Sequence, residues 1–203
     1  MIEIEKKFQL SQTELARLLV GAKPLRGKRF SDTYYDSADL RLTTRDIWLR
    51  SRDGVFELKV PLRTDKNRNK TDVYREIITE PEITKELSLP TSRSFSESLK
   101  LAGLQPFCTI VTERKKYKRG DFAIDIDRAD FGYQVTEIEL EAPSEAEIKQ
   151  TEKKILDFAK SLGFSTGPLN GKVCEWIMRN NPAHYEALVK AGVFGSYQWT
   201  RPR

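Results

Sequence analysis

Pairs of acidic residues separated by a single position recur in this sequence. They are Glu3 and Glu5, Asp125 and Asp127, and Glu137 and Glu139. Side chains two positions apart in a β-strand point to the same face, so each pair would place two mutually repelling carboxylates side by side. A hard divalent cation such as Mg²⁺, which prefers oxygen ligands, would relieve that repulsion. The pairs therefore indicate a candidate metal site.

Two arginines repeat the same spacing in the run from Trp48 to Arg52, at positions 50 and 52. Guanidinium groups are permanently charged planar forks that match the geometry of phosphate oxygens. If the strands close into a barrel, the acidic and basic side chains face one lumen. Bases that bind an anion next to acids that hold a metal are the requirements of metal-assisted chemistry on a polyphosphate.

Strands with one apolar and one charged face must position these groups. The alternation predicts strands over 2–8, 47–52, 55–60, 122–127 and 134–141, and 110–118 is predicted as a further strand. Asp53-Gly54 predicts a hairpin turn between two of them, and Arg119-Gly120-Asp121 predicts another. Strands joined by such short turns are therefore predicted to pair as an antiparallel meander.

Helices are predicted between and after the strands. Ser11 with Glu14, and Ser144 with Glu147, have the spacing of capping boxes. The second pair is expected to open a long helix with an apolar stripe, ended by Gly163. Shorter helices are predicted over 82–87, 95–101, 173–179 and 182–190. Strands followed by helices, with antiparallel pairing, favour an α+β fold over a doubly wound parallel sheet.

Two simpler interpretations remain open at this point. An ordinary antiparallel sheet with its charged face in water explains the alternation alone, although exposed strand positions favour Thr, Gln and Lys over repeated acids. A basic module that binds nucleic acid or inositol polyphosphates without catalysis explains the arginines. Acid pairs beside the bases would repel the phosphates that such a binding groove must attract, which disfavours this interpretation. A nucleic-acid site should also show exposed aromatic residues among clustered bases.

The composition sets broad limits on the protein. Its 203 residues carry 35 Lys and Arg against 30 Asp and Glu, a formal charge of +5. We expect one domain over 1–203, with a mobile linker at 63–72 and a flexible tail at about 195–203. The acidic N-terminus, the lack of a long apolar stretch and two widely separated cysteines favour a cytoplasmic protein with no membrane segment. Cys108 and Cys174 are expected in the core, and His184 at the surface or at a helix cap.

The segment Glu3-Ile4-Glu5-Lys6-Lys7 resembles the Glu-x-Glu-x-Lys signature of the CYTH superfamily, the triphosphate tunnel metalloenzymes. Further motifs follow in order over most of the chain: Asp32-Thr33-Tyr34-Tyr35-Asp36, Trp48-Leu49-Arg50-Ser51-Arg52, Glu57-Leu58-Lys59, Tyr74-Arg75-Glu76, Thr112-Glu113-Arg114, 125–132, Glu137-Ile138-Glu139 and Lys172. The resemblance implies an eight-stranded antiparallel β-barrel with flanking helices, a tunnel that binds triphosphate and a divalent metal.

Within the superfamily the chain looks most like the animal thiamine triphosphatase branch. The similarity rests on Asp-x-Ala-Asp-Phe-Gly-Tyr at 127–133, on Trp48 two positions before the first arginine, and on Asn-Pro-x-x-Tyr at 181–185. The resemblance implies Mg²⁺-dependent removal of the terminal phosphate of thiamine triphosphate, with Mn²⁺ as a possible substitute. Inorganic triphosphate, a nucleoside triphosphate or, more distantly, adenylate cyclisation are the alternatives. A monomer that binds a small molecule and no nucleic acid is expected.

The resemblance also implies roles for individual residues. The triphosphate would contact Lys7, Arg50, Arg52, Lys59, Arg114 and Lys172. The metal ligands would be Glu3, Glu5, Asp125, Glu137 and Glu139. Asp127 could be a further ligand, a hydrogen-bond acceptor or a partner of a tunnel base, and the same three roles are possible for Glu76. Tyr34 and Lys59 match an acid/base pair for the attack by water, and Trp48 matches an aromatic residue that stacks on the thiamine ring.

Overall fold

The computed structural model describes residues 2–62, 71–92 and 94–193. Most of the linker predicted at 63–72, and the whole tail predicted at about 195–203, lie outside the described residues. None of the helices in the described part of the chain is both long and apolar enough to cross a membrane.

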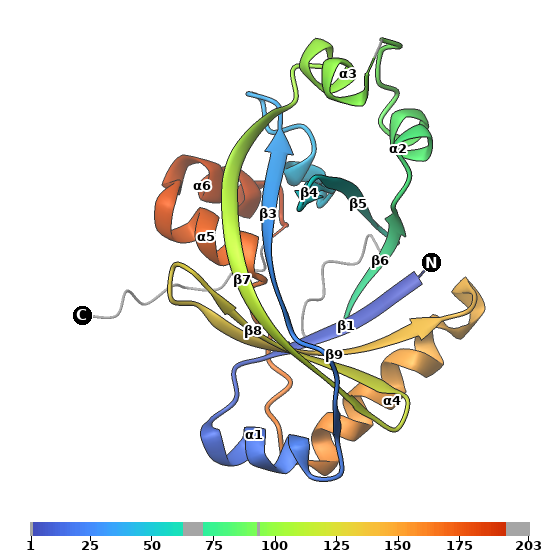
Figure 1. Ribbon diagram of the computed structural model, residues 1–203, viewed down its shortest axis with the longest axis vertical. Coiled ribbons are helices and arrows are strands. Elements are labelled where there is room, and N and C mark those ends of the chain that lie inside the picture. Colours follow the sequence, from blue (N-terminus) through green and yellow to red (C-terminus); the bar gives the residue numbers. More distant parts are fainter. Residues whose placement is uncertain (1, 63–70, 93, 194–203) are drawn as a thin grey trace.

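A closed antiparallel barrel organises the chain (Figure 1). The strands are β1 (Ile2–Phe8), β2 (Lys23–Pro24), β3 (Lys28–Asp36), β4 (Trp48–Arg52), β5 (Val55–Pro61), β6 (Asp72–Ile77), β7 (Gln105–Arg119), β8 (Phe122–Ala129) and β9 (Gln134–Ala142). Eight of them follow one another around the barrel in the order β7-β3-β4-β5-β6-β1-β9-β8, and the pairing of β8 with β7 closes it. The short β2 is an extra strand at the edge of β7. The predicted eight-stranded barrel is confirmed.

The hairpins also form as predicted. Asp53 and Gly54 both have positive φ, at 49° and 92°, the conformation that a two-residue hairpin turn requires. Gly120 has a φ of 57° between β7 and β8. The sequence pattern missed β2, β3 and β6. In β3 the buried positions carry Phe30, Asp32, Tyr34 and Asp36, which present no regular apolar face.

The helices are α1 (Gln12–Leu19), α2 (Glu80–Glu86), α3 (Phe95–Leu101), α4 (Ile148–Ser161), α5 (Lys172–Asn180) and α6 (Pro182–Lys190), with 3₁₀ turns η1 (Thr43–Arg45) and η2 (Glu145–Glu147). The capping box of Ser11 and Glu14 is present at α1. The one predicted at Ser144 is wrong: η2 comes first, the Ser144 hydroxyl accepts from no main-chain amide, and it donates instead to the Glu147 carboxylate at 3.2 Å. The tighter 3₁₀ turn shifts the α-helical start to Ile148.

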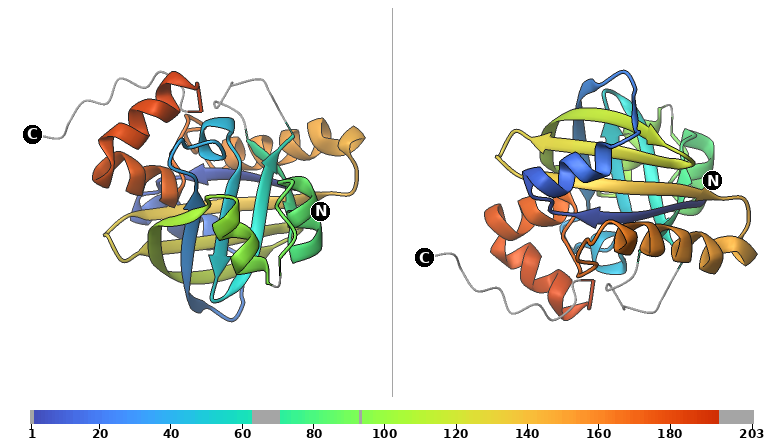
Figure 2. Two further views of the ribbon diagram at one scale, coloured as in Figure 1. Left: turned by 90° about the horizontal axis from the view of Figure 1, so that it is seen from above. Right: turned by 90° about the horizontal axis from the view of Figure 1, so that it is seen from below.

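Most of the apolar core lies outside the barrel, between the strands and the helices, although one cluster includes the lumen residues Tyr34, Trp48 and Tyr74. Ile4 and Phe8 of β1 belong to one buried cluster with Ile155 and Ala159 of α4. Two other clusters lie beneath α5 and α6 and beneath α2 and α3. Figure 2 shows α4 and the α5–α6 pair placed against the outer side of the strands. Because helices cover the apolar side chains of β1, β4, β5, β8 and β9, the charged side chains at the alternate positions of these strands point into the lumen.

His184 does not lie at the surface as expected. Its side chain is only 2% exposed, and its Nε2 lies 2.8 Å from the Thr43 hydroxyl oxygen. The first turn of α6 packs onto η1 and the ring of Phe107, which buries the imidazole away from solvent. The expected cap is present at the same place, but Asn181 provides it by accepting a hydrogen bond from the His184 main-chain amide. Cys108 and Cys174 are both buried, as predicted.

Candidate active site

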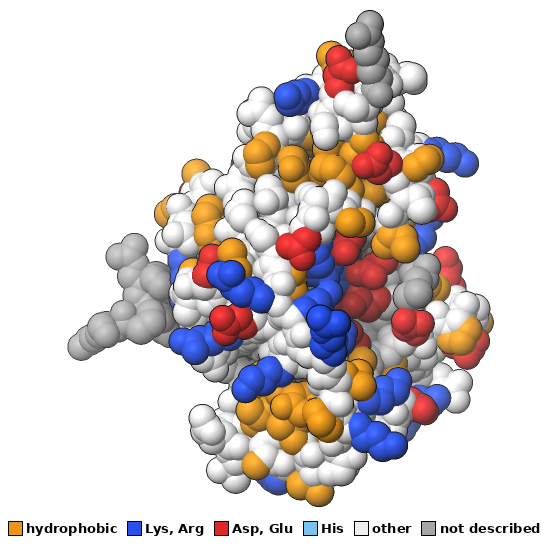
Figure 3. Space-filling view, viewed as in Figure 1, with side chains coloured by type: hydrophobic (Ala, Val, Ile, Leu, Met, Phe, Trp, Pro, Cys, Tyr) orange, Lys and Arg blue, Asp and Glu red, His pale blue; other side chains and the backbone are white. Residues whose placement is uncertain are grey.

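A cavity of about 310 Å³ occupies the barrel lumen. Its lining contains every base predicted to contact triphosphate: Lys7, Arg50, Arg52, Lys59, Arg114 and Lys172. Tyr34 and Trp48 line it, as do the predicted acids Glu3, Glu5, Glu137 and Glu139. Figure 3 shows basic and acidic side chains gathered side by side in the central hollow of the molecule. The barrel thus brings together residues from across the sequence.

The acids gather where β1, β9 and β8 run side by side. Glu3, Glu5 and Glu139 offer carboxylate oxygens within 4.8 Å of one another, and Asp125, Glu137 and Glu139 form a second such triplet. The strand register explains this convergence, because Glu5 lies opposite Glu139 and Asp125 lies opposite Glu137. Glu139 is shared by both triplets.

One buried atom indicates that a cation fits this cluster. Oδ1 of Asp125 is fully buried and has no hydrogen-bond partner among the residues that the structure describes. Buried carboxylate oxygens are normally hydrogen-bonded or bound to a metal. An oxygen-only donor set is the one that Mg²⁺ and Mn²⁺ accept. The two triplets therefore could hold a hard divalent cation.

The pKa values of the acids show where negative charge is in excess. Burial, together with the neighbouring Glu3 and Glu137 carboxylates, holds the pKa of Glu139 well above its usual range. Burial also raises the pKa of Asp125, despite the nearby Arg114. Burial acts in the same direction at Glu137, but Lys172 and Arg114 outweigh it, so the pKa of Glu137 is lowered. The excess of negative charge therefore lies at Glu139, whereas burial is the main cause of the raised pKa of Asp125, which contacts the bases Arg114 and Lys116.

Replacing Glu139 with Gln is expected to stabilise the protein in chelator at alkaline pH. Because the pKa of Glu139 is higher in the folded than in the unfolded chain, its ionisation destabilises the native state as pH rises from about 4.5 through the folded pKa. At pH 8 the variant should gain about 1 to 2 kcal/mol in free energy of unfolding, and the gain should vanish near pH 4. Urea unfolding in EDTA at both pH values measures this.

Glu113→Gln is the matched control, because Glu113 also lies on a barrel strand, β7, but is exposed and does not line the cavity. Its stability should equal that of the wild type at both pH values. Equal stability of Glu139→Gln and the wild type at pH 8 would show that the acidic cluster carries no electrostatic strain.

Two acids that the sequence analysis assigned no role hold the arginine pair. Asp32, which is 1% exposed, accepts from Arg52 through both oxygens, at 2.8 Å from Nε and 2.9 Å from Nη2. Glu57 accepts from Arg50 Nη2 at 2.6 Å. The ring of Phe30 lies beneath Arg52, 4.2 Å from its Cζ. These contacts fix both guanidinium groups at the lumen wall. The advance signal was the position of each acid in an ordered motif, Asp32 in Asp-Thr-Tyr-Tyr-Asp and Glu57 in Glu-Leu-Lys.

Arg114 and Lys172 converge on Asp127. Arg114 forms a double hydrogen bond with Asp127, at 2.6 Å from both Nε and Nη2, and also contacts Asp125 and Glu137. Lys172, at the start of α5, contacts Asp127 and lies 3.7 Å from Glu137. Asp127 lies in neither acid triplet. Of the roles left open for Asp127, this geometry favours that of a partner to the tunnel bases.

The remaining lumen bases and Tyr34 are held in protonated form. Lys7 contacts Glu5 and lies 2.6 Å from Asp72, and Lys59 contacts Glu3 and lies 3.2 Å from Glu76. Although burial opposes it, these acids raise the pKa of Lys59 above its usual range. Burial raises the pKa of Tyr34 to about 12. At neutral pH both members of the predicted Tyr34–Lys59 pair are therefore proton donors.

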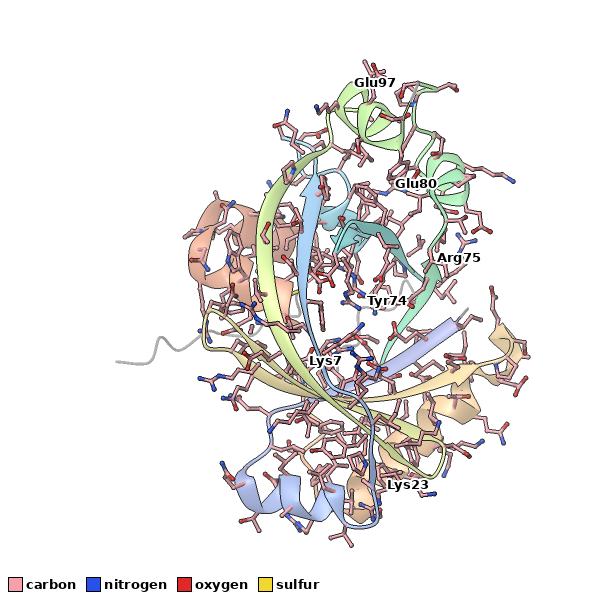
Figure 4. All side chains as sticks on the ribbon, in the orientation of Figure 1. Lys7, Lys23, Tyr74, Arg75, Glu80 and Glu97 are labelled. Atoms are coloured by element: carbon pink, nitrogen blue, oxygen red, sulfur yellow. The ribbon has the colours of Figure 1, made fainter. Side chains whose placement is uncertain are left out.

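One end of the cavity is aromatic. Trp48 and Tyr74 line it together with Asp46, Leu169, Val173 and Cys174, and Tyr34 adjoins them beside Arg50. In Figure 4 the labelled Tyr74 and Lys7 both lie toward the central opening of the barrel, although they belong to different strands. An organic group carried by a polyphosphate would find an apolar surface here. Neither Tyr74 nor Asp46 was predicted as a site residue.

Comparison with known proteins places this chain in a family. Residues 1–168 match the CYTH domain family. The protein named thiamine-triphosphatase from Homo sapiens is 32% identical, with 94% of this chain and 90% of that protein covered, and the Macaca fascicularis protein of the same name is 30% identical over the same shares. The PH1819 structure from Pyrococcus horikoshii OT3 has a TM-score of 0.64 and 19% identity, with 88% of this chain and 99% of that chain covered, and so shares the fold. The chain belongs to the CYTH domain family.

Proposed function

We propose that this protein hydrolyses thiamine triphosphate to thiamine diphosphate and phosphate, with Mg²⁺ as its cofactor. The observation that carries the proposal is a single closed lumen in which six bases face two acid triplets, with an aromatic surface at one end. The names of the relatives from Homo sapiens and Macaca fascicularis support thiamine triphosphate as the substrate.

The acid triplets are the proposed metal ligands: Glu3, Glu5, Asp125, Glu137 and Glu139. When bound, Mg²⁺ would neutralise charge on the phosphate oxygens, and Mn²⁺ suits the same oxygen ligands. The bases would bind the phosphate chain, because Arg50, Arg52 and Arg114 present fixed guanidinium forks toward the cavity. An incoming triphosphate would replace the carboxylates that these bases now contact.

The hydrolysis breaks the bond between the terminal phosphorus and its bridging oxygen and forms a bond from that phosphorus to a water oxygen. Catalysis of such a transfer rests mainly on positioning and electrostatic stabilisation. Lys59 and Tyr34, both protonated at neutral pH, would donate hydrogen bonds to phosphate oxygens where charge develops. Trp48 would stack on the thiamine ring at the aromatic end of the cavity.

A panel of phosphate-release assays tests the proposal. Purified protein is given thiamine triphosphate, inorganic triphosphate or ATP, each with Mg²⁺, Mn²⁺ or EDTA. We expect thiamine triphosphate to be cleaved with a kcat/KM at least about tenfold above the others, and EDTA to abolish cleavage. Faster cleavage of inorganic triphosphate or ATP would assign that substrate instead. Activity undiminished by EDTA would exclude the metal role, and binding without cleavage would indicate a binding module.

A further inference from the structure

Asp46 connects two aromatic residues at the end of the lumen cavity. It lies between η1 and β4 and lines the cavity beside them. Its Oδ1 accepts a hydrogen bond from the Trp48 indole Nε1 at 2.9 Å and from the Tyr74 hydroxyl at 3.0 Å. Trp48 belongs to β4 and Tyr74 to β6, which are separated by β5 in the barrel. One carboxylate oxygen therefore fixes the two rings relative to each other across an intervening strand.

The backbone around Asp46 is itself held in place. Asp46 has a φ of 61°, a left-handed conformation that non-glycine residues rarely adopt and that Asp and Asn tolerate best. Its amide donates to the Thr43 carbonyl at 3.0 Å. Asp36 in turn accepts from the amides of Leu42 and Thr43 and from the Thr43 hydroxyl. The carboxylate of Asp46 is thus presented to the cavity by a turn with little conformational freedom.

This arrangement changes what the aromatic end can bind. A carboxylate that accepts the indole N–H polarises the ring toward greater electron density on its π face. Cations are attracted to the face of Trp more strongly than to that of other aromatic residues. A carboxylate beside the ring adds a direct attraction for positive charge and disfavours a phosphate at that end. The aromatic end therefore suits a positively charged heteroaromatic ring better than a neutral base or a bare phosphate.

We propose that Asp46 is a specificity-determining residue that positions Trp48 and Tyr74 and selects triphosphates carrying a cationic heteroaromatic group. The proposal rests on the proposed function, because thiamine triphosphate carries such a group. Asp46 acts through the two aromatic residues and takes no part in cleavage of the phosphate bond. Its removal should therefore weaken recognition of the organic end and leave the chemistry at the phosphate unchanged.

Asp46→Asn provides the test, because Asn keeps a hydrogen-bond acceptor and tolerates positive φ while removing the charge. We expect kcat/KM for thiamine triphosphate to fall about 10- to 30-fold, mainly through KM, and that for inorganic triphosphate to stay within about twofold. Asp46→Ala also removes the acceptor and should lower kcat/KM for thiamine triphosphate further. Asp53→Asn is the matched control, since Asp53 has a φ of 49° but accepts from the Ser31 amide outside the cavity lining.

The outcomes separate this proposal from the proposed function. A wild-type preference for thiamine triphosphate that survives unchanged in Asp46→Asn overturns the role of Asp46 alone. Equal losses on thiamine triphosphate and inorganic triphosphate would show a general structural effect and would also overturn it. Absence of any wild-type preference for thiamine triphosphate overturns both proposals.

Discussion

Glu5→Gln is expected to reduce turnover of thiamine triphosphate at least about 1000-fold while leaving the fold intact. Glu5 is 5% exposed and belongs to the triplet with Glu3 and Glu139. A neutral amide of the same shape removes one of the negative charges that would hold the metal. Steady-state phosphate release across a range of Mg²⁺ concentrations measures the loss, and excess Mg²⁺ should restore part of the activity.

The fold should survive because the partners of Glu5 keep other contacts. Lys7 retains Asp72 at 2.6 Å, and Lys59 retains Glu76 at 3.2 Å. The free energy of unfolding should therefore change by less than about 1 kcal/mol. Glu113→Gln, an exposed acid on β7 that does not line the cavity, serves as the control and should keep wild-type turnover. Wild-type rates in Glu5→Gln would remove Glu5 from the site.

Arg114→Gln is expected to lower both stability and activity. Its guanidinium group contacts Asp125, Asp127 and Glu137, all of which are buried. Removing one partner of a buried ion pair leaves uncompensated charge and typically costs about 3 to 5 kcal/mol. We expect a loss of that size in free energy of unfolding at pH 7, measured in urea, together with a large rise in KM for the triphosphate.

The pH dependence identifies the cause of this loss. The lowered pKa of Glu137 means that its ionised form stabilises the native state at pH values above about 4.5, and that this contribution is lost as pH falls. Because Arg114 is one source of that lowering, the difference between wild type and variant should shrink in acid. Lys116→Gln is the control: Lys116 also contacts Asp125, at 3.2 Å, but is partly exposed, so it should cost less than about 1 kcal/mol. A pH-independent loss would point to packing rather than charge.

Much of the barrel was predictable because the signal is local. Five of the barrel strands show an apolar and a charged face in the sequence itself, and Asp53-Gly54 marks a hairpin without reference to the rest of the chain. β3 was not predicted because its buried positions mix aromatic and charged residues, Phe30 and Asp32 among them, so the alternation that identifies a half-buried strand is absent. The false capping box at Ser144 shows that spacing alone cannot exclude a 3₁₀ turn before a helix.

The sequence alone determined which side chains share a face, because that depends only on the period of two along one strand. It also carried the ordered motifs of the CYTH family, and that resemblance implied that the acids and arginines share one barrel lumen. Only the tertiary structure decided which of them touch. Glu139 belongs to both triplets because β9 pairs with β1 on one side and with β8 on the other. Asp127 sits with Arg114 and Lys172, and Asp46 joins Trp48 to Tyr74, because strand register and barrel closure bring together residues distant in the chain.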